Sequence, residues 1–286
     1  MGYPSTGEWE DVSGVFQRAI DFSTSVCTNV QMSARVIAPL ARAGWDTEHP
    51  FERQTFMNMV ANTIQGILPS LRVPTGQTAT VVVSAFPPLD PTIWAETALA
   101  YIPTNVLEPW PSAAPEWAIM RRLTNCLGSN GFTRVLTLAM ERFNGMKGSV
   151  WGYNDPVALS TMRNLINGDS YAEFFLKLKL AYVTILTGMR WNMGILRYLH
   201  YQSRGVEVDL VGRFDEWWTA HLNAIISVIQ VWATQCLDDA TKRWAARVDI
   251  MQTIDALRLI ADGLAIARVG FRTNQYQITA MPPTLP

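Results

Sequence analysis

Residues 217–237, WWTAHLNAIISVIQVWATQCL, form a stretch of 21 residues without one charged side chain. A helix of about 20 apolar residues can cross a bilayer. Here, however, polar residues recur every three or four positions, and hydrocarbon does not favour such a ridge on a lone span. The ridge is Thr219, Asn223, Ser227, Gln230 and Thr234, and the opposing apolar stripe is Trp218, Leu222, Ile225, Ile229, Trp232 and Cys236. The stretch therefore predicts a helix whose uncharged outer face presses on another subunit. A membrane-associated helix at 217–237 is the second interpretation.

Helical spacing of apolar residues extends from this stretch over nearly the whole chain. Residues 11–43 are interpreted as one or two helices, and residues 240–269 as the last long helix. Proline in the first turn marks further helix starts, with aspartate as an N-cap candidate in two of them. These starts are His49-Pro50, Asp90-Pro91, Ala114-Pro115 and Asp155-Pro156. The pattern predicts an all-α fold of about ten helices in a compact multi-helix domain, with at most a small β-hairpin around 77–85 and a short strand at 206–210.

The domain organisation follows from the weakness of the linker signals. The proline-rich stretches at 68–91 and 108–115 are too short and too poor in charge to separate independent domains. Residues 1–286 are therefore predicted to form a single helical domain, in which two lobes would meet near residues 110–150. Residues 270–286 are predicted to be an extended C-terminal arm.

The composition indicates a surface shaped by contact with protein. Charged residues make up 16% of the chain, where about 25% is usual, and the net charge is −1. This balance provides no bulk field for nucleic acid or an anionic membrane. There are 19 arginines against 4 lysines, together with 11 tryptophans and 12 methionines. Protein interfaces are enriched in Arg, Trp and Met and depleted in Lys. Codon bias is the alternative explanation of the Arg to Lys ratio, but it does not account for the tryptophans.

No motif in the sequence predicts a reaction. The three histidines and three cysteines have no metal-ligand spacing, and the phosphate-binding and nucleophile motifs are absent. The sequence thus predicts a protein that is not an enzyme, with no catalytic residue, cofactor or metal. One all-α enzyme class is kept as an alternative, the magnesium-dependent isoprenoid synthases, because Asp238-Asp239 would begin a helix. The third carboxylate of such a site is missing, and capping of a helix start is the ordinary role of the pair.

Six residues are predicted to lie at an interface between subunits, and His221 to pack or hydrogen-bond there. For the tryptophans the alternative is that they fill the core of their own chain. The six are Trp217, Trp218, Trp232, Trp244, Arg243 and Arg247.

Low charge, abundant Trp, Met, Asn and Pro, a preference for arginine, and helices joined by proline-capped turns together resemble a viral shell protein. In style, without a shared motif, the chain resembles the helical layer of the trimeric capsid proteins that form the T=13 shell of non-turreted double-stranded RNA reoviruses. Those proteins usually insert a β-sandwich between their helical halves, and no run of strands predicted here is long enough to supply one. The chain would then be a helix-only member or have a different capsid role.

The resemblance implies a structural capsid protein of the virion, assembled in the host cytoplasm. Its expected partners are two further copies in a homotrimer, neighbouring capsid subunits and an inner shell protein. Direct contact with nucleic acid and a membrane span are not expected.

Overall fold

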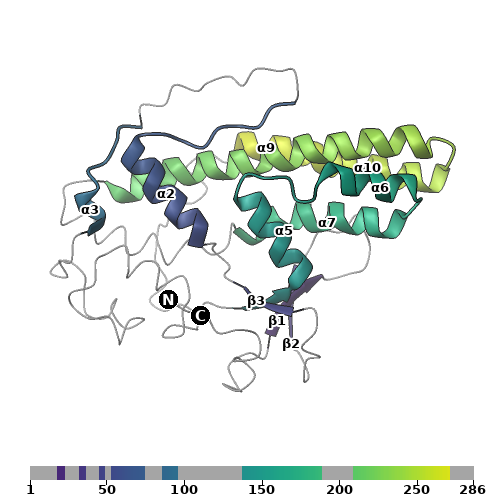
Figure 1. Ribbon diagram of the computed structural model, residues 1–286, viewed down its shortest axis with the longest axis horizontal. Coiled ribbons are helices and arrows are strands. Elements are labelled where there is room, and N and C mark those ends of the chain that lie inside the picture. Colours follow the sequence, from purple (N-terminus) through teal and green to yellow (C-terminus); the bar gives the residue numbers. More distant parts are fainter. Residues whose placement is uncertain are drawn as a thin grey trace.

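The computed structural model describes residues 18–22, 32–36, 45–48, 53–74, 86–95, 137–188 and 209–270. A long helical hairpin is the element on which the other described helices pack. The hairpin consists of α9 (Leu210–Trp244) and α10 (Val248–Gly270), joined by the turn at 245–247. The two helices lie side by side along the long axis (Figure 1). Asp209 caps the start of α9, because its side chain accepts a hydrogen bond of 2.8 Å from the Gly212 amide.

Shorter helices pack on this hairpin. α5 (Glu141–Trp151), α6 (Leu159–Asn167) and α7 (Tyr171–Gly188) follow one another in the chain, and all three contact α9. α2 (Arg53–Gln65) crosses the N-terminal half of α9, and α3 (Thr92–Ala95) is a single short turn nearby (Figure 1). Helices thus dominate the described residues, as the sequence predicts, but the described part contains seven of them instead of about ten.

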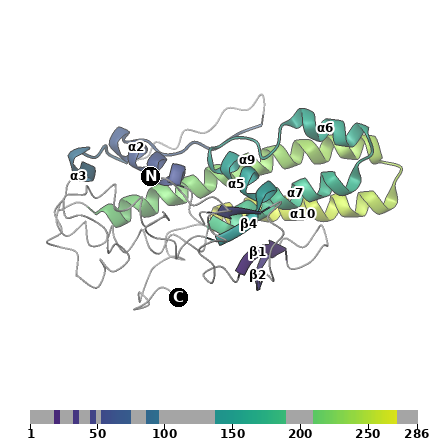
Figure 2. The ribbon, with the colours of Figure 1, turned by 60° about the horizontal axis from the view of Figure 1, so that its bottom comes forward.

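A small sheet lies beside α5, away from the tip of the hairpin (Figures 1 and 2). Its strands are β1 (Arg18–Phe22), β2 (Met32–Val36), β3 (Trp45–Glu48) and β4 (Thr137–Met140), in the order β2-β1-β4-β3. β1 pairs antiparallel with β2 and parallel with β4, and β3 pairs antiparallel with β4. β4 leads directly into α5, so the sheet fixes the start of that helix.

This sheet corrects the prediction of helices over 11–43, since both β1 and β2 fall in that range. Local helical spacing is a weak signal when a distant strand supplies the hydrogen bonds, and β4 is such a partner. The hairpin predicted at 77–85 lies outside the described residues, as do most of the lobe boundary at 110–150 and the arm that follows α10. Of the strand predicted at 206–210, Leu210 instead begins α9.

Other helix boundaries follow the sequence signals more closely. α2 ends before Pro69, and the side chain of Asp90 accepts a hydrogen bond from the Thr92 amide at the start of α3. Asp155 does not cap α6: the N-cap is Ala158, and the Asp155 carboxylate pairs with Arg72. The last helix starts at Val248 and not at 240, because α9 continues unbroken through Asp238 and Asp239 to Trp244.

The hydrophobic core runs along α9 and is rich in aromatic side chains. Phe174 and Phe175 of α7 pack against the indole of Trp244, and Phe214 stacks on Trp218 at a centroid distance of 5.7 Å. Edge-to-face and offset ring pairs of this kind add to the stabilisation that burial alone gives. The largest buried side chains include Trp151, Trp217, Trp218, Trp232, Tyr182, Phe56, Phe143, Phe174 and Phe214.

Candidate functional site

A fully buried histidine and a partly buried tyrosine form a polar pair within this aromatic core. The hydroxyl of Tyr153, in the loop after α5, is 2.7 Å from Nδ1 of His221 on α9. The imidazole is fully buried, and its Nε2 has no hydrogen-bond partner among the described residues. A buried nitrogen without a partner is costly, so His221 is held there by its packing and by the single bond to Tyr153.

Tryptophan rings enclose the imidazole of His221. Trp217 stacks on it, with centroids 4.8 Å apart and an angle of 11° between the planes. Trp151 meets it edge to face at 5.6 Å, and Trp218 lies at 5.4 Å. We call His221, Tyr153 and these three tryptophans the His221 cluster. Because the enclosure is apolar, water cannot solvate a positive charge on the ring.

Burial determines the protonation state of both polar members of the cluster. It lowers the pKa of His221 to about 3, because the charged imidazolium would lose its hydration. It raises the pKa of the Tyr153 hydroxyl well above its usual range for the same reason, since the phenolate is also charged. Both groups are therefore neutral at pH 7. A neutral imidazole has one donor and one acceptor nitrogen, so Tyr153 donates to Nδ1 in one tautomer and accepts from it in the other.

The backbone of Tyr153 is held in an uncommon conformation. Its φ is 63°, in the left-handed region that non-glycine residues seldom adopt. Such a conformation costs on the order of 1 kcal/mol and persists where the surroundings determine it. Here the surroundings are the hydrogen bond of the side chain to His221 and a bond from Arg72 to the backbone oxygen.

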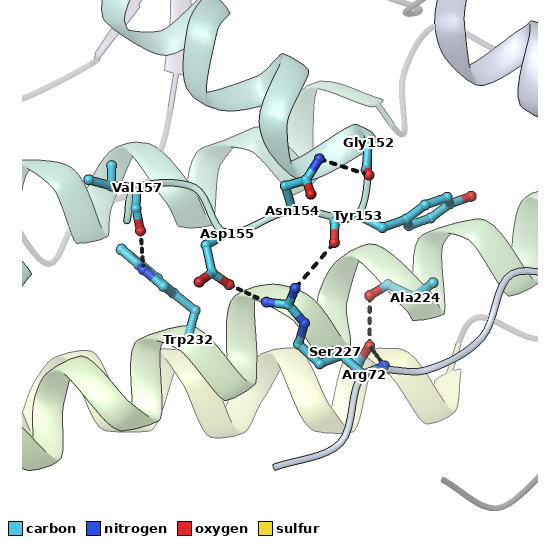
Figure 3. A network of polar contacts seen from close by, with 9 residues as sticks. All are labelled: Arg72, Gly152, Tyr153, Asn154, Asp155, Val157, Ala224, Ser227 and Trp232. Carbon is cyan, nitrogen blue, oxygen red and sulfur yellow. Dashed lines mark hydrogen bonds and ion pairs between the residues drawn. The ribbon is translucent and has the colours of Figure 1, made fainter. Parts of the chain in front are cut away.

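Arg72 ties an extended segment across this loop (Figure 3). We call residues 66–74, which follow α2, the strap, and residues 152–158, which join α5 to α6, the clasp loop. The Arg72 guanidinium pairs with Asp155 and donates a 3.3 Å hydrogen bond to the Tyr153 carbonyl. The Arg72 amide donates to Oγ of Ser227 on α9 at 2.7 Å, and that hydroxyl donates to the Ala224 carbonyl. The strap, the clasp loop and α9 are therefore joined in one polar network.

The clasp loop has a second anchor on α9. The indole nitrogen of Trp232 donates a 2.8 Å hydrogen bond to the carbonyl of Val157 (Figure 3). The loop is thus held at Tyr153, at Asp155 and at Val157, by two residues of α9 and one of the strap.

This arrangement fits a structural role better than a catalytic one. His221 is neutral and fully buried, and a general base must be able to reach a proton of its substrate. An open pocket of about 520 Å³ lies elsewhere, between β3 and the start of α5, and no residue of the His221 cluster lines it. Its lining residues are Asp46, Glu141, Arg142, Asn144 and Gly145.

The structure corrects the prediction that four tryptophans lie at an interface. Trp217, Trp218, Trp232 and Trp244 are each at most 2% exposed within this single chain. They fill the core of their own subunit, which was the alternative interpretation. The reason lies in the hairpin: α10 and the α5–α7 helices surround α9, so an aromatic stripe on α9 is covered by its own chain.

The structure also corrects two related predictions, that the uncharged ridge of α9 presses on another subunit and that His221 lies at an interface. Ser227 is buried under the strap, and the Gln230 amide donates a 3.1 Å hydrogen bond to the Ala261 carbonyl of α10. Ser227 and Gln230 therefore pack on the chain's own segments, whereas Thr234 of the same ridge is exposed. His221 hydrogen-bonds inside the core and not at an interface. His49 and His200 lie outside the described residues.

Arg243 and Arg247 both lie on the surface at the tip of the hairpin. Arg243 pairs with Asp169 at 3.4 Å, and Arg247 pairs with Asp249 at 3.1 Å and lies over the ring of Tyr171. Their prediction as interface residues remains a prediction, because these contacts lie within one chain.

The aspartate pair considered for magnesium is engaged in ion pairs. Asp238 pairs with Arg258 at 2.8 Å, and Asp239 pairs with Arg163 at 3.1 Å. Both residues lie inside α9, so they do not cap a helix start. Within the described residues, no three His, Cys, Asp or Glu side chains gather as they would around a metal ion.

No helix in the described part of the chain is both long and apolar enough to span a bilayer, α9 with its uncharged stretch included. Comparison with known proteins gave no match: neither a protein-family model, nor a curated protein, nor a solved structure is similar to this chain.

Proposed function

We propose that this chain is a structural subunit that assembles with further copies of itself, and that the assembly is a viral capsid shell. In this proposal the protein binds other subunits and catalyses no reaction: its homotrimers contact neighbouring subunits and an inner shell. The T=13 arrangement and the virion location belong to the same proposal, which rests on the resemblance in composition and helical style.

The structural observation that supports this proposal is the outer face of α10. Leu259 is 72% exposed and Val248 is 71% exposed, although the opposite face of the same helix packs on α9. The two residues are 11 positions apart, which is three helical turns, so they share one side of the helix about 16 Å apart. Large apolar residues on a helix face that the described residues leave uncovered fit contact with another protein.

A second copy of this chain is the partner we propose for that face. By helical spacing, the polar residues on the same side of α10 as Val248 and Leu259 are Gln252, Asp255 and Asp262, which are all exposed. The tip of the same hairpin adds exposed Arg243 and Arg247, and arginine is enriched at contacts between proteins. Trp217, Trp218, Trp232 and Trp244 are buried within their own chain and contribute no interface.

Leu259→Asp tests this proposal, with Asn164→Asp on the exposed surface of α6 as the control of equal charge. Sedimentation of the purified full chain should show a trimer or larger species for the native sequence and for the control. The Leu259→Asp variant should show smaller species at the same concentration with an unchanged melting temperature. A native protein that remains monomeric at high concentration would overturn the proposal.

A further inference from the structure

The His221 cluster and the network around Arg72 share one residue, Tyr153. Its hydroxyl reaches His221 inside the core, and its carbonyl accepts a hydrogen bond from Arg72 on the strap. Any change that moves Tyr153 therefore acts on both the core and the strap. This link is independent of the proposed assembly function.

Protonation of the imidazole changes the hydrogen bond that Tyr153 can make with His221. Nδ1 can accept the phenol proton only while it carries no proton itself. When the ring is protonated, both nitrogens become donors, and the Tyr153 hydroxyl must turn its lone pair inward or leave. Nε2 already lacks a partner among the described residues, so the new cation has no acceptor there.

Charged groups of both signs lie on the elements around His221. Lys147 of α5 is fully buried, with its ammonium 5.0 Å from the centre of the Trp151 ring that also contacts His221. Asp155 of the clasp loop is paired with Arg72. On α9, Asp215 and Glu216 lie between one and two turns before His221, and burial raises the pKa of the Asp215 carboxyl. The other charged side chains on α5 and α7, the helices that pack on this part of α9, are Glu141, Arg142, Glu173, Lys177 and Lys179.

The clasp loop is the part of this region that can give way. It is an irregular connection, and the φ of 63° at Tyr153 would relax once the side chain is released. α9, by contrast, is held along its length by α10 and by the α5–α7 helices. Release of Tyr153 also removes one of the acceptors of Arg72, so the strap loses part of its anchorage.

We propose that Tyr153 and His221 form an acid-released clasp, which holds the clasp loop and the strap on α9 at neutral pH and frees both when His221 takes up a proton. Opening lets water reach the imidazole, and the open form therefore binds the proton at the ordinary pKa of histidine. The opening equilibrium should rise by up to about tenfold for each pH unit below about 6.5.

Hydrogen exchange of the full chain, read by mass spectrometry from pH 7.5 to pH 4.5 and corrected for the intrinsic rate at each pH, tests the clasp. Peptides that cover 66–74 and 152–158 should lose protection by about tenfold per pH unit below 6.5. Peptides from α6 and α7 should keep theirs. The wild-type experiment is decisive alone: constant protection in the clasp loop, or an equal loss in α6 and α7, would overturn the proposal.

Two variants sharpen the test. His221→Phe keeps an aromatic ring in the stack on Trp217 but cannot be protonated, so exchange of the clasp loop should no longer depend on pH. Tyr153→Phe removes only the hydroxyl, and it should lower protection of the clasp loop already at pH 7.5. A His221→Phe protein that keeps the full pH dependence would assign the opening to another group and refute the role of His221.

Discussion

Replacement of Trp232 by alanine is expected to destabilise the isolated subunit strongly. The indole is 1% exposed and lies between α9 and the clasp loop, where its nitrogen donates to the Val157 carbonyl at 2.8 Å. Truncation of a buried tryptophan to alanine costs about 3–5 kcal/mol, and the orphaned Val157 carbonyl places this site in the upper half of that range. For a chain of this size, such a loss lowers the melting temperature by roughly 10 °C.

Circular dichroism melts measure the effect of Trp232→Ala on stability, and sedimentation velocity at the same protein concentration measures its effect on assembly. Asn164→Ala is the control, since that side chain is exposed on α6 and its truncation should change stability by less than about 0.5 kcal/mol. A Trp232→Ala protein that melts like the wild type but assembles less would refute the core position of this residue. That result would place Trp232 at an interface between subunits.

Three further predictions concern local structure. Gly66→Ala should lower the free energy of unfolding by about 1–3 kcal/mol in urea denaturation, because φ is +69° there and a Cβ would lie 2.9 Å from Pro88 Cδ. Gly145→Ala, inside α5, should raise the free energy of unfolding by about 0.5–1 kcal/mol, because a Cβ there meets nothing within 4 Å. Asp209→Ala should cost about 0.5–2 kcal/mol in the same assay, since it removes the cap of α9, and no loss would contradict the capping bond. Trp244→Phe should raise the pKa of the Asp169 carboxyl in an NMR titration, because the indole hydrogen bond is the largest cause of its lowered value, and an unchanged pKa would refute that assignment.

The pH dependence of global stability follows from His221 with a definite sign. Its pKa is lowered to about 3 in the folded chain and lies near 6.5 when unfolded, so the unfolded state binds the proton first. The contribution is fully present above about pH 6.5 and is lost as the pH falls toward 3, by about 1.4 kcal/mol for each unit. Chemical denaturation of wild type and His221→Phe at several pH values would show this difference.

Periodicity and turn residues in the sequence were sufficient for the helical character of the chain. α2 begins at Arg53, shortly after the predicted start signal His49-Pro50. Asp90 caps the start of α3, as the sequence predicts. The 217–237 stretch is helical as predicted. These features depend on contacts a few residues apart, which a sequence displays directly.

Local sequence patterns could not predict the sheet, nor which faces of α9 are covered by other segments of the chain. β1 depends on β4, more than 100 residues further along the chain, and five-residue segments carry little signal of their own. The ridge of Ser227 and Gln230 was read as an outer face because its polar residues match helical spacing. In the folded chain they bond to the strap and to α10, and periodicity does not distinguish a solvent-facing polar stripe from one that another segment covers.

The Tyr153–His221 pair was also missed. The two residues are 68 positions apart, and no motif links them. One signal was present: a lone histidine in the middle of an uncharged, tryptophan-rich helix is a buried polar group that needs a partner.

Electron microscopy of the material from which this protein comes tests the central claim, a subunit that acts through contacts between copies, most directly. The account predicts a repeating lattice in which the outer face of α10, with Leu259 and Val248, lies against a neighbouring subunit. Isolated single chains with that face open to solvent would contradict it.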